Sequence, residues 1–220
     1  MRKIIIASLS ILTLFFLTAC RSYEPRPRID IDSLSHNELM LRAMDLGEHR
    51  TITMSGDIFP LTCIDVLASW SDDIVRVEVL DERVEVLNIS LIPEEMFWIH
   101  TINRLRVLEV FKGDTEIGDI IEVAQPGGRL GYVEAISSFT VPLTVGDELV
   151  LFLINHNIEF DVDLPRFLTA TGLQSIFQFP ALSGESIGAF SSDQEIMAGN
   201  EMGTMTLTVG DLMRFAAEHR

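Results

Sequence analysis

Cysteine is scarce in this chain, because only Cys20 and Cys63 occur among 220 residues. Exported domains normally use their cysteines in disulfide pairs, so another role for Cys20 would leave no internal bridge. A chain of this length can build a hydrophobic core without bridges, and we expect one domain on a tether. Cys63 lies among apolar neighbours, which favours a small buried side chain, with a reactive thiol as the alternative.

Positive charge is scarce as well. The chain has 33 acidic and 16 basic residues, and its formal net charge of −17 would become −19 if Arg2 and Lys3 left with a signal peptide. Such a surface repels nucleic acid and anionic lipid headgroups, so we expect no nucleic-acid partner. Basic partners or divalent cations would be attracted, although the net charge does not select among them.

The spacings that bind metals are absent from the sequence. The histidines form neither His-x-x-x-His nor His-Glu-x-x-His, so no zinc site is expected. The acidic segments 72–73 and 161–163 do not fit the calcium loop of an EF-hand, and solvated turns explain them better. We therefore predict neither a metal nor a cofactor. The residues considered are His36, His49, His100, His156, His219, Asp72, Asp73, Asp161 and Asp163.

The apolar run at the N-terminus is too short to span a membrane. It covers residues 4–17, which are 14 residues, whereas a spanning helix needs about 20. Because Arg2 and Lys3 precede it, the run is typical of a secretory signal. The run ends in the sequence Leu-Thr-Ala-Cys, which resembles the lipobox of bacterial lipoproteins and places its cysteine at Cys20.

The lipobox resemblance implies a lipid anchor. In that family the cysteine thiol receives a diacylglyceryl group, the chain is cut before the cysteine, and the new amine is acylated, with palmitate among the expected chains. Each buried methylene contributes about 0.8 kcal/mol, so two or three chains anchor firmly. We expect Cys20 to hold the protein at the extracytoplasmic face of a bacterial cell membrane. An ordinary signal peptide with a chance cysteine is the alternative.

A short amphipathic helix is predicted after a proline-containing spacer. Ser35 and Glu38 have the spacing of a capping box, and Gly47 is predicted to end the helix. We expect this helix to dock onto the main domain. The predicted organisation is a signal peptide at 1–19, the lipidated cysteine with spacer and helix at 20–57, and an OB-like β-barrel domain with flanking helices at 58–220.

The rest of the chain alternates as strands do, between two further helices. One helix is predicted over 60–70, with Pro60 in its first turn, and one over 208–219, with Thr208 as its N-cap. The strands are predicted over 74–80, 83–89, 98–111, 119–125 and 147–154, and less clearly over 176–182.

These elements predict a mainly β fold. The first two strands are separated by a predicted turn at Asp81-Glu82. No strand–helix–strand rhythm is present, which argues against a parallel nucleotide-binding sheet. We expect a small antiparallel OB-like barrel or sandwich of five or six strands, with helices at its margins.

The segment Lys112-Gly113-Asp114 could be read as part of a phosphate-binding loop. Such a loop leads directly into a helix, whose N-terminus binds the anion. Here a strand follows instead, and the neighbouring acidic residues would repel phosphate. Gly113 suits a tight reversal with a positive φ angle, so the segment predicts a hairpin. Gly127-Gly128 is predicted to close the next turn.

The stretches VLEVFKGDTEIGDIIEVAQPGG and PLTVGDELVLFLI resemble a pattern of uncharacterised bacterial envelope proteins. The resemblance spans roughly residues 60 to 215, and its motifs are structural rather than chemical. More remotely, the chain is similar to the netrin-like barrel of the tissue inhibitors of metalloproteinases, which implies an OB-type fold. Those inhibitors bind zinc through a free N-terminal cysteine and carry disulfides. The expected acylated terminus here gives protease inhibition little support.

One segment matches an enzyme motif. Gly184–Gly188 has the Gly-x-Ser-x-Gly pattern of a nucleophile elbow, with Ser186 at its centre and His219 downstream. That elbow needs a strand before the serine and a helix after it. Neither is indicated by the sequence, so a glycine-rich loop is the better interpretation. An envelope serine hydrolase that uses Ser186 remains the alternative function.

The sequence favours a non-enzymatic, lipid-anchored module that binds a protein or a surface polymer. Arg104 and Arg106 alternate along one strand, and an outward polar row opposite acidic strands explains them. Trp70 and Phe97 are expected in the core. Trp98 is predicted to be an exposed binding aromatic.

Overall fold

A computed structural model shows that the chain forms two compact units, Met1–Ser33 and Leu34–Arg220. In the first unit, a 3-10 turn η1 covers Ile31–Ser33. The second unit is mainly β, which confirms the predicted class. The described residues are 30–55, 60–89, 95–155, 167–169, 172–179, 190–198 and 205–219.

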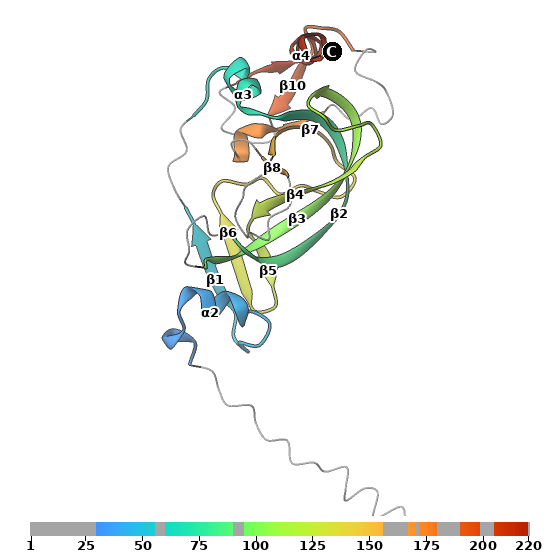
Figure 1. The fold of residues 1–220 in the computed structure, drawn as a ribbon. Helices are drawn as coiled ribbons and strands as arrows, with labels where there is room; N and C mark the ends of the chain where they lie inside the picture. The colour runs from blue at the N-terminus through green and yellow to red at the C-terminus, as the bar shows by residue number, and fades with distance from the viewer. Residues whose placement is uncertain are drawn as a thin grey trace, which may run out of the picture. The chain divides into compact units, whose positions relative to one another are not determined.

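Five strands of the second unit close into a barrel (Figure 1). Around the ring the order is β7, β2, β3, β4, β8 and back to β7. The β4–β8 pair is parallel and every other pair in the ring is antiparallel. A closed five-stranded barrel of this kind is OB-like, as expected. The strands are β2 (Asp73–Asn88), β3 (Phe97–Lys112), β4 (Ile120–Pro126), β7 (Glu148–Asn155) and β8 (Phe167–Thr169).

Six shorter strands surround the barrel, so the described residues contain more strands than the five or six predicted. One group extends the barrel sheet outward from β7, and the other forms a separate sheet in the order β1-β6-β5. These strands have two to five residues, too few for a period-two pattern. They are β9 (Ile176–Gln178), β10 (Glu195–Ala198), β11 (Leu207–Thr208), β1 (Arg50–Met54), β5 (Gly128–Leu130) and β6 (Val133–Ser137).

The compact domain begins earlier than residue 58, where the sequence placed its start. Strand β1 pairs in parallel with β6, far along the chain. Helix α2 (His36–Leu41) docks on the start of β3, where Asn37 Nδ2 donates to the Glu95 carbonyl at 2.7 Å. The predicted capping box of α2, between Ser35 and Glu38, is confirmed. The helix ends at Leu41 rather than near Gly47, because tertiary contacts set its length.

The predicted turn at Asp81-Glu82 is wrong, because β2 runs through it without a break. The pairing of β2 with β3 shifts register between Val79 and Asp81, as at a β-bulge. A bulge adds one residue to one strand and so exchanges the faces of the residues that follow. Val79 therefore faces the barrel interior, whereas Asp81 and Arg83 lie on the outer surface.

Strand β7 is buried on both faces, which explains its uninterrupted apolar sequence. Leu149, Leu151 and Leu153 pack inside the barrel. Val150 and Phe152 point the other way and pack under helices α3 (Ile64–Trp70) and α4 (Val209–Glu218). The Phe152 ring lies 5.5 Å from that of Phe177 and 6.4 Å from that of Phe215.

Helix α3 starts later than predicted, because Cys63 is its N-cap and Pro60 precedes its first turn. Its C-terminal end is bound by Lys112, the lysine that ends β3. Lys112 Nζ donates to the carbonyl oxygens of Ala68 at 2.9 Å and Ser71 at 2.5 Å. A positive charge at a helix C-terminus is stabilising, so Lys112 has a structural role and does not serve a phosphate.

Helix α4 begins with the predicted Thr208 cap, which forms a capping box with Asp211. Partial burial would raise the pKa of Asp211. The hydrogen bonds from Thr208, together with Arg214, outweigh burial and hold that pKa below its ordinary value. The ionised carboxylate therefore stabilises the fold above the unfolded-state pKa, and this contribution is lost as the pH falls through the folded-state value.

We expect Asp211→Asn to lower the free energy of unfolding by about 0.5–1 kcal/mol at pH 7. The loss should shrink at pH 3, below the ordinary aspartate pKa of about 3.9. Urea denaturation at the two pH values measures it. Glu218→Gln, in the last turn of the same helix, is the matched control and should change little. Equal losses for Asp211→Asn at both pH values would contradict the role of its charge.

Candidate functional site

A cleft of about 400 Å³ lies where the long β2–β3 hairpin passes the smaller sheet. In Figure 1, β2 and β3 curve from the barrel past β5 and β6. The volume is within the range of small-molecule sites. The polar side chains that line it come from separate elements: Glu82 of β2, Thr101 of β3, Gln125 of β4, Arg129 of β5 and Glu134 of β6.

One wall of the cleft is a corner at Gly127-Gly128, where the chain leaves β4 and enters β5. Both residues have positive φ angles, 114° and 127°. A Cβ atom on Gly128 would lie 2.7 Å from Thr101 Oγ1, so glycine lets β5 approach β3 closely. The structure corrects the prediction that these glycines close a hairpin turn, because the turn between β5 and β6 lies at Gly131 and Tyr132.

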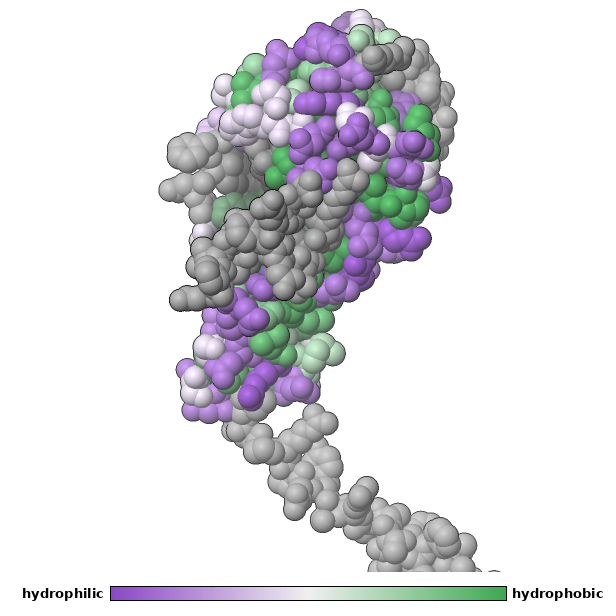
Figure 2. Space-filling model, in the orientation of Figure 1, coloured by the Kyte–Doolittle hydropathy of each residue, from purple (hydrophilic) through white to green (hydrophobic). Residues whose placement is uncertain are grey.

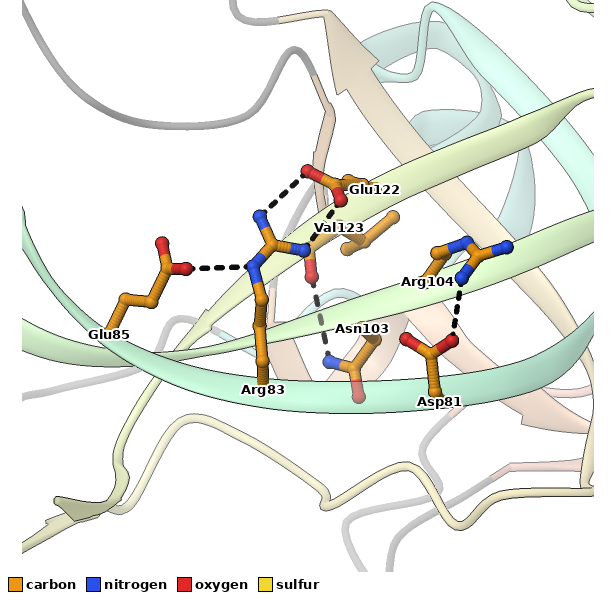
Figure 3. Close-up of polar contacts among 7 residues, drawn as sticks. All are labelled: Asp81, Arg83, Glu85, Asn103, Arg104, Glu122 and Val123. Atoms are coloured by element: carbon orange, nitrogen blue, oxygen red, sulfur yellow. Dashed lines mark hydrogen bonds and ion pairs between the residues drawn. The ribbon is translucent and has the colours of Figure 1, made fainter.

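A buried amide network underlies the cleft. Asn103 Nδ2 donates to Gln125 Oε1 at 3.1 Å, and Gln125 Nε2 donates to the Val141 carbonyl at 3.1 Å. Asn103 is fully buried and Gln125 is 3% exposed. Asn103 Nδ2 also lies 3.5 Å from the Val123 carbonyl, as Figure 3 shows. Asn103 Oδ1 is buried and has no hydrogen-bond partner among the described residues.

Two carboxylates line the cleft from different strands, Glu82 and Glu134. Neither forms an ion pair with another residue of the described ranges. The cationic side chain of the lining, Arg129, lies with Nη2 at 3.4 Å from His49 Nδ1. The lining therefore has an excess of negative charge.

The outer face of the barrel carries paired charges. Arg83 donates to Glu85 Oε1 at 2.8 Å and to the two oxygens of Glu122 at 2.5 and 3.0 Å (Figure 3). These bonds, first that from Glu122 and then that from Glu85, raise the pKa of Arg83. The hydrogen bond from Arg83 in turn lowers the pKa of Glu122. All three side chains are 40–46% exposed, so each pair stabilises little.

Arg104 and Arg106 lie in this outer row, opposite acidic residues as predicted. Arg104 Nη1 is 2.8 Å from Asp81 Oδ2, and Arg106 Nη1 is 3.2 Å from Glu78 Oε2. The face drawn in Figure 2 is accordingly mostly hydrophilic, with apolar patches between the polar side chains. Because both arginines are paired, this row is a poor candidate for an anion-binding site.

Two aromatic predictions are wrong. Trp98 is 6% exposed and stacks on His36, with 5.0 Å between the ring centroids, so it is not an exposed binding aromatic. Trp70 is 56% exposed rather than part of the core. Helix α2 covers Trp98, and the sequence does not predict that contact. Nearby His100 is buried, and burial lowers its pKa.

Cys63 is exposed, which corrects the expectation of a buried thiol. Its apolar neighbours face the core from α3, whereas the N-cap position itself faces solvent. In a chain that begins after Cys20, we expect Ellman's reagent to titrate one thiol in the native protein, about as fast as in urea. Cys63→Ser should abolish the reaction. A thiol that reacts only after denaturation would contradict this exposure.

The other candidate residues do not converge. Asp73 Oδ1 accepts from Thr115 Oγ1 at 2.7 Å, and Asp72 Oδ2 accepts from the Asn155 amide at 2.7 Å, so both aspartates hold loops in place. Within the described ranges, no group of three or more His, Cys, Asp or Glu side chains could hold a metal ion. Several residues singled out in the sequence lie outside the described ranges: Cys20, His156, Asp161, Asp163 and Ser186.

Sequence reasoning missed the cleft, because its polar side chains are spread from Glu82 to Glu134 without a motif. The signal that was available is the pair of amide residues, Asn103 and Gln125, at inward positions of otherwise apolar strands. None of the helices described is long and apolar enough to span a bilayer. No protein-family model matches this chain, and no curated protein matches it.

Proposed function

We propose that this protein is a lipid-anchored, extracytoplasmic module of a bacterial envelope that binds its ligand in the cleft between the β2–β3 hairpin and the β5–β6 strands. The observation that carries the proposal is the cleft itself, with its underlying amide network. Binding needs no bond-breaking residue. We therefore favour a binding module over an enzyme.

The construction of the cleft supports a binding role. Its walls belong to paired strands, and Gln125 is held at both ends of its amide, by Asn103 and by the Val141 carbonyl. Side chains that are ordered before binding lose little conformational entropy when a ligand arrives. A polar ligand would therefore meet groups that are already in position.

The proposed anchor follows from the lipobox-like ending at Cys20. We expect the mature chain to carry thioether-linked diacylglycerol there, with the spacer at 21–32 between the lipid and the domain. Mass spectrometry of the protein purified from membranes should find the acylated N-terminal peptide. Cys20→Ser should release the protein from the membrane fraction, whereas Cys63→Ser should not. An intact N-terminal methionine on the purified wild type would contradict the anchor.

Binding is tested by thermal denaturation of the full chain against a panel of charged and neutral envelope fragments. A ligand that occupies the cleft should raise Tm in wild type and not in Gly128→Val, whose side chain would fill the corner. Labelling with a fluorophosphonate tests the alternative. A serine adduct that disappears in Ser186→Ala would favour the hydrolase over the binding module.

A further inference from the structure

We infer that the cleft accepts a positively charged hydrogen-bond donor, an ammonium or guanidinium group on a slender aliphatic chain. This inference rests on the proposed binding role and names the ligand class for the same cleft. The cleft combines carboxylates from two strands with a buried acceptor, Asn103 Oδ1, that lacks a donor within the described chain.

The carboxylates define where the charge would lie. Glu82 comes from β2 and Glu134 from β6, so they approach a ligand from different elements. Neither is neutralised by an ion pair within the described part of the chain. Concave sites focus the potential of the charges that line them. An anion would be repelled there, and a cation would be attracted, more so on a protein with a net charge of −17.

Asn103 adds a requirement for hydrogen-bond donors. It pairs across the hairpin with Glu82 and donates to Gln125, and these two residues line the cleft. Its Nδ2 points toward β4, so Oδ1 is at the opposite end of the amide (Figure 3). Buried acceptors normally have partners. A donor entering between Glu82 and Gln125 would supply the missing bond, which a metal ion or an apolar group would not.

The remaining lining suits an aliphatic stem. Pro126, Pro142 and Leu143 present apolar surface beside the polar groups. Long basic chains bury their methylene groups on such surface while the charged head finds polar partners. The volume of about 400 Å³ admits one such chain rather than a folded element. A free diamine and the lysine or arginine side chain of a partner protein share this chemistry.

The test is isothermal titration of the full chain in a nonionic detergent. The probes are 1,5-diaminopentane, N-acetyl-lysine methylamide and, as the matched anion, glutarate. We expect both amines to bind, with affinities that fall as salt is added, and glutarate not to bind. Tenfold tighter binding of the lysine amide would indicate a protein side chain as the source, and the reverse would indicate a free diamine.

Variants locate the binding. Glu82→Gln and Glu134→Gln should each weaken amine binding at least tenfold, and Asn103→Leu should weaken it with the fold retained. Glu116→Gln, which removes an exposed carboxylate of the β3–β4 loop, should leave it unchanged. Amine binding that is absent, or that is insensitive to Glu82→Gln and Glu134→Gln, overturns the inference. Glutarate binding that Gly128→Val abolishes would overturn it while leaving the proposed binding role intact.

Discussion

Replacing Arg76 with alanine is expected to lower the free energy of unfolding by about 3 kcal/mol, at the lower end of the range for breaking a buried ion pair. The Arg76 side chain is 3% exposed. It donates to Glu109 at 3.2 Å and to Glu148, and its guanidinium carbon lies 4.1 Å from the centroid of the Phe179 ring. Alanine would leave two carboxylates without their cation. Because they are 15% and 16% exposed, water screens part of the loss.

The same hairpin offers a matched control. Arg106 on β3 pairs with Glu78 on β2, as Arg76 on β2 pairs with Glu109 on β3. The Arg106 pair is half exposed, so Arg106→Ala should cost less than about 1 kcal/mol. Urea denaturation of the two variants gives the comparison. Equal losses would show that burial does not strengthen the Arg76 cluster.

Gly113→Ala is expected to destabilise the fold by about 2–5 kcal/mol, combining backbone strain with overpacking. Gly113 has a φ angle of 105°, and an added Cβ would collide with the Asp73 side chain and lie 2.9 Å from the Asp72 carbonyl oxygen. Asp73 cannot easily move, because it is buried and accepts hydrogen bonds from Thr115. The denaturation midpoint in urea measures the loss.

Gly118→Ala separates strain from collision. Gly118 also has a positive φ angle, 93°, but nothing lies within 4 Å of an added Cβ. We expect it to cost about 1–2 kcal/mol, from strain alone. If Gly113→Ala costs no more than Gly118→Ala, the contact with Asp73 does not restrict that turn.

Local patterns predicted much of the fold. The long strand at 97–112, the double-sided apolar strand at 148–155 and the caps at Ser35 and Thr208 follow from periodicity and hydrogen-bonding residues within a few positions. The bulge between Val79 and Asp81 could not be predicted in this way. A β-bulge changes one pairing in a hairpin, and two adjacent acidic residues suggest a turn equally well.

The candidate site depended on that bulge. It exchanges the faces of β2, so that Asp81 and Arg83 join the outer ion pairs while Glu82 lines the cleft beside β6. The sequence alone treats all three as an acidic turn. Their division into a paired outer face and an unpaired inner face exists only once β5 and β6 have folded against the hairpin.

The sequence by itself determined the mainly β class, the helix caps and the hairpin character of the segment around Gly113, because these depend on neighbours within a few residues. The tertiary structure alone decided that β8 closes the barrel, that Trp98 is covered while Cys63 and Trp70 are exposed, and that Glu82, Gln125 and Glu134 meet at one cleft. Burial and proximity result from packing between segments far apart in the chain, and a single sequence does not record which segments pack together.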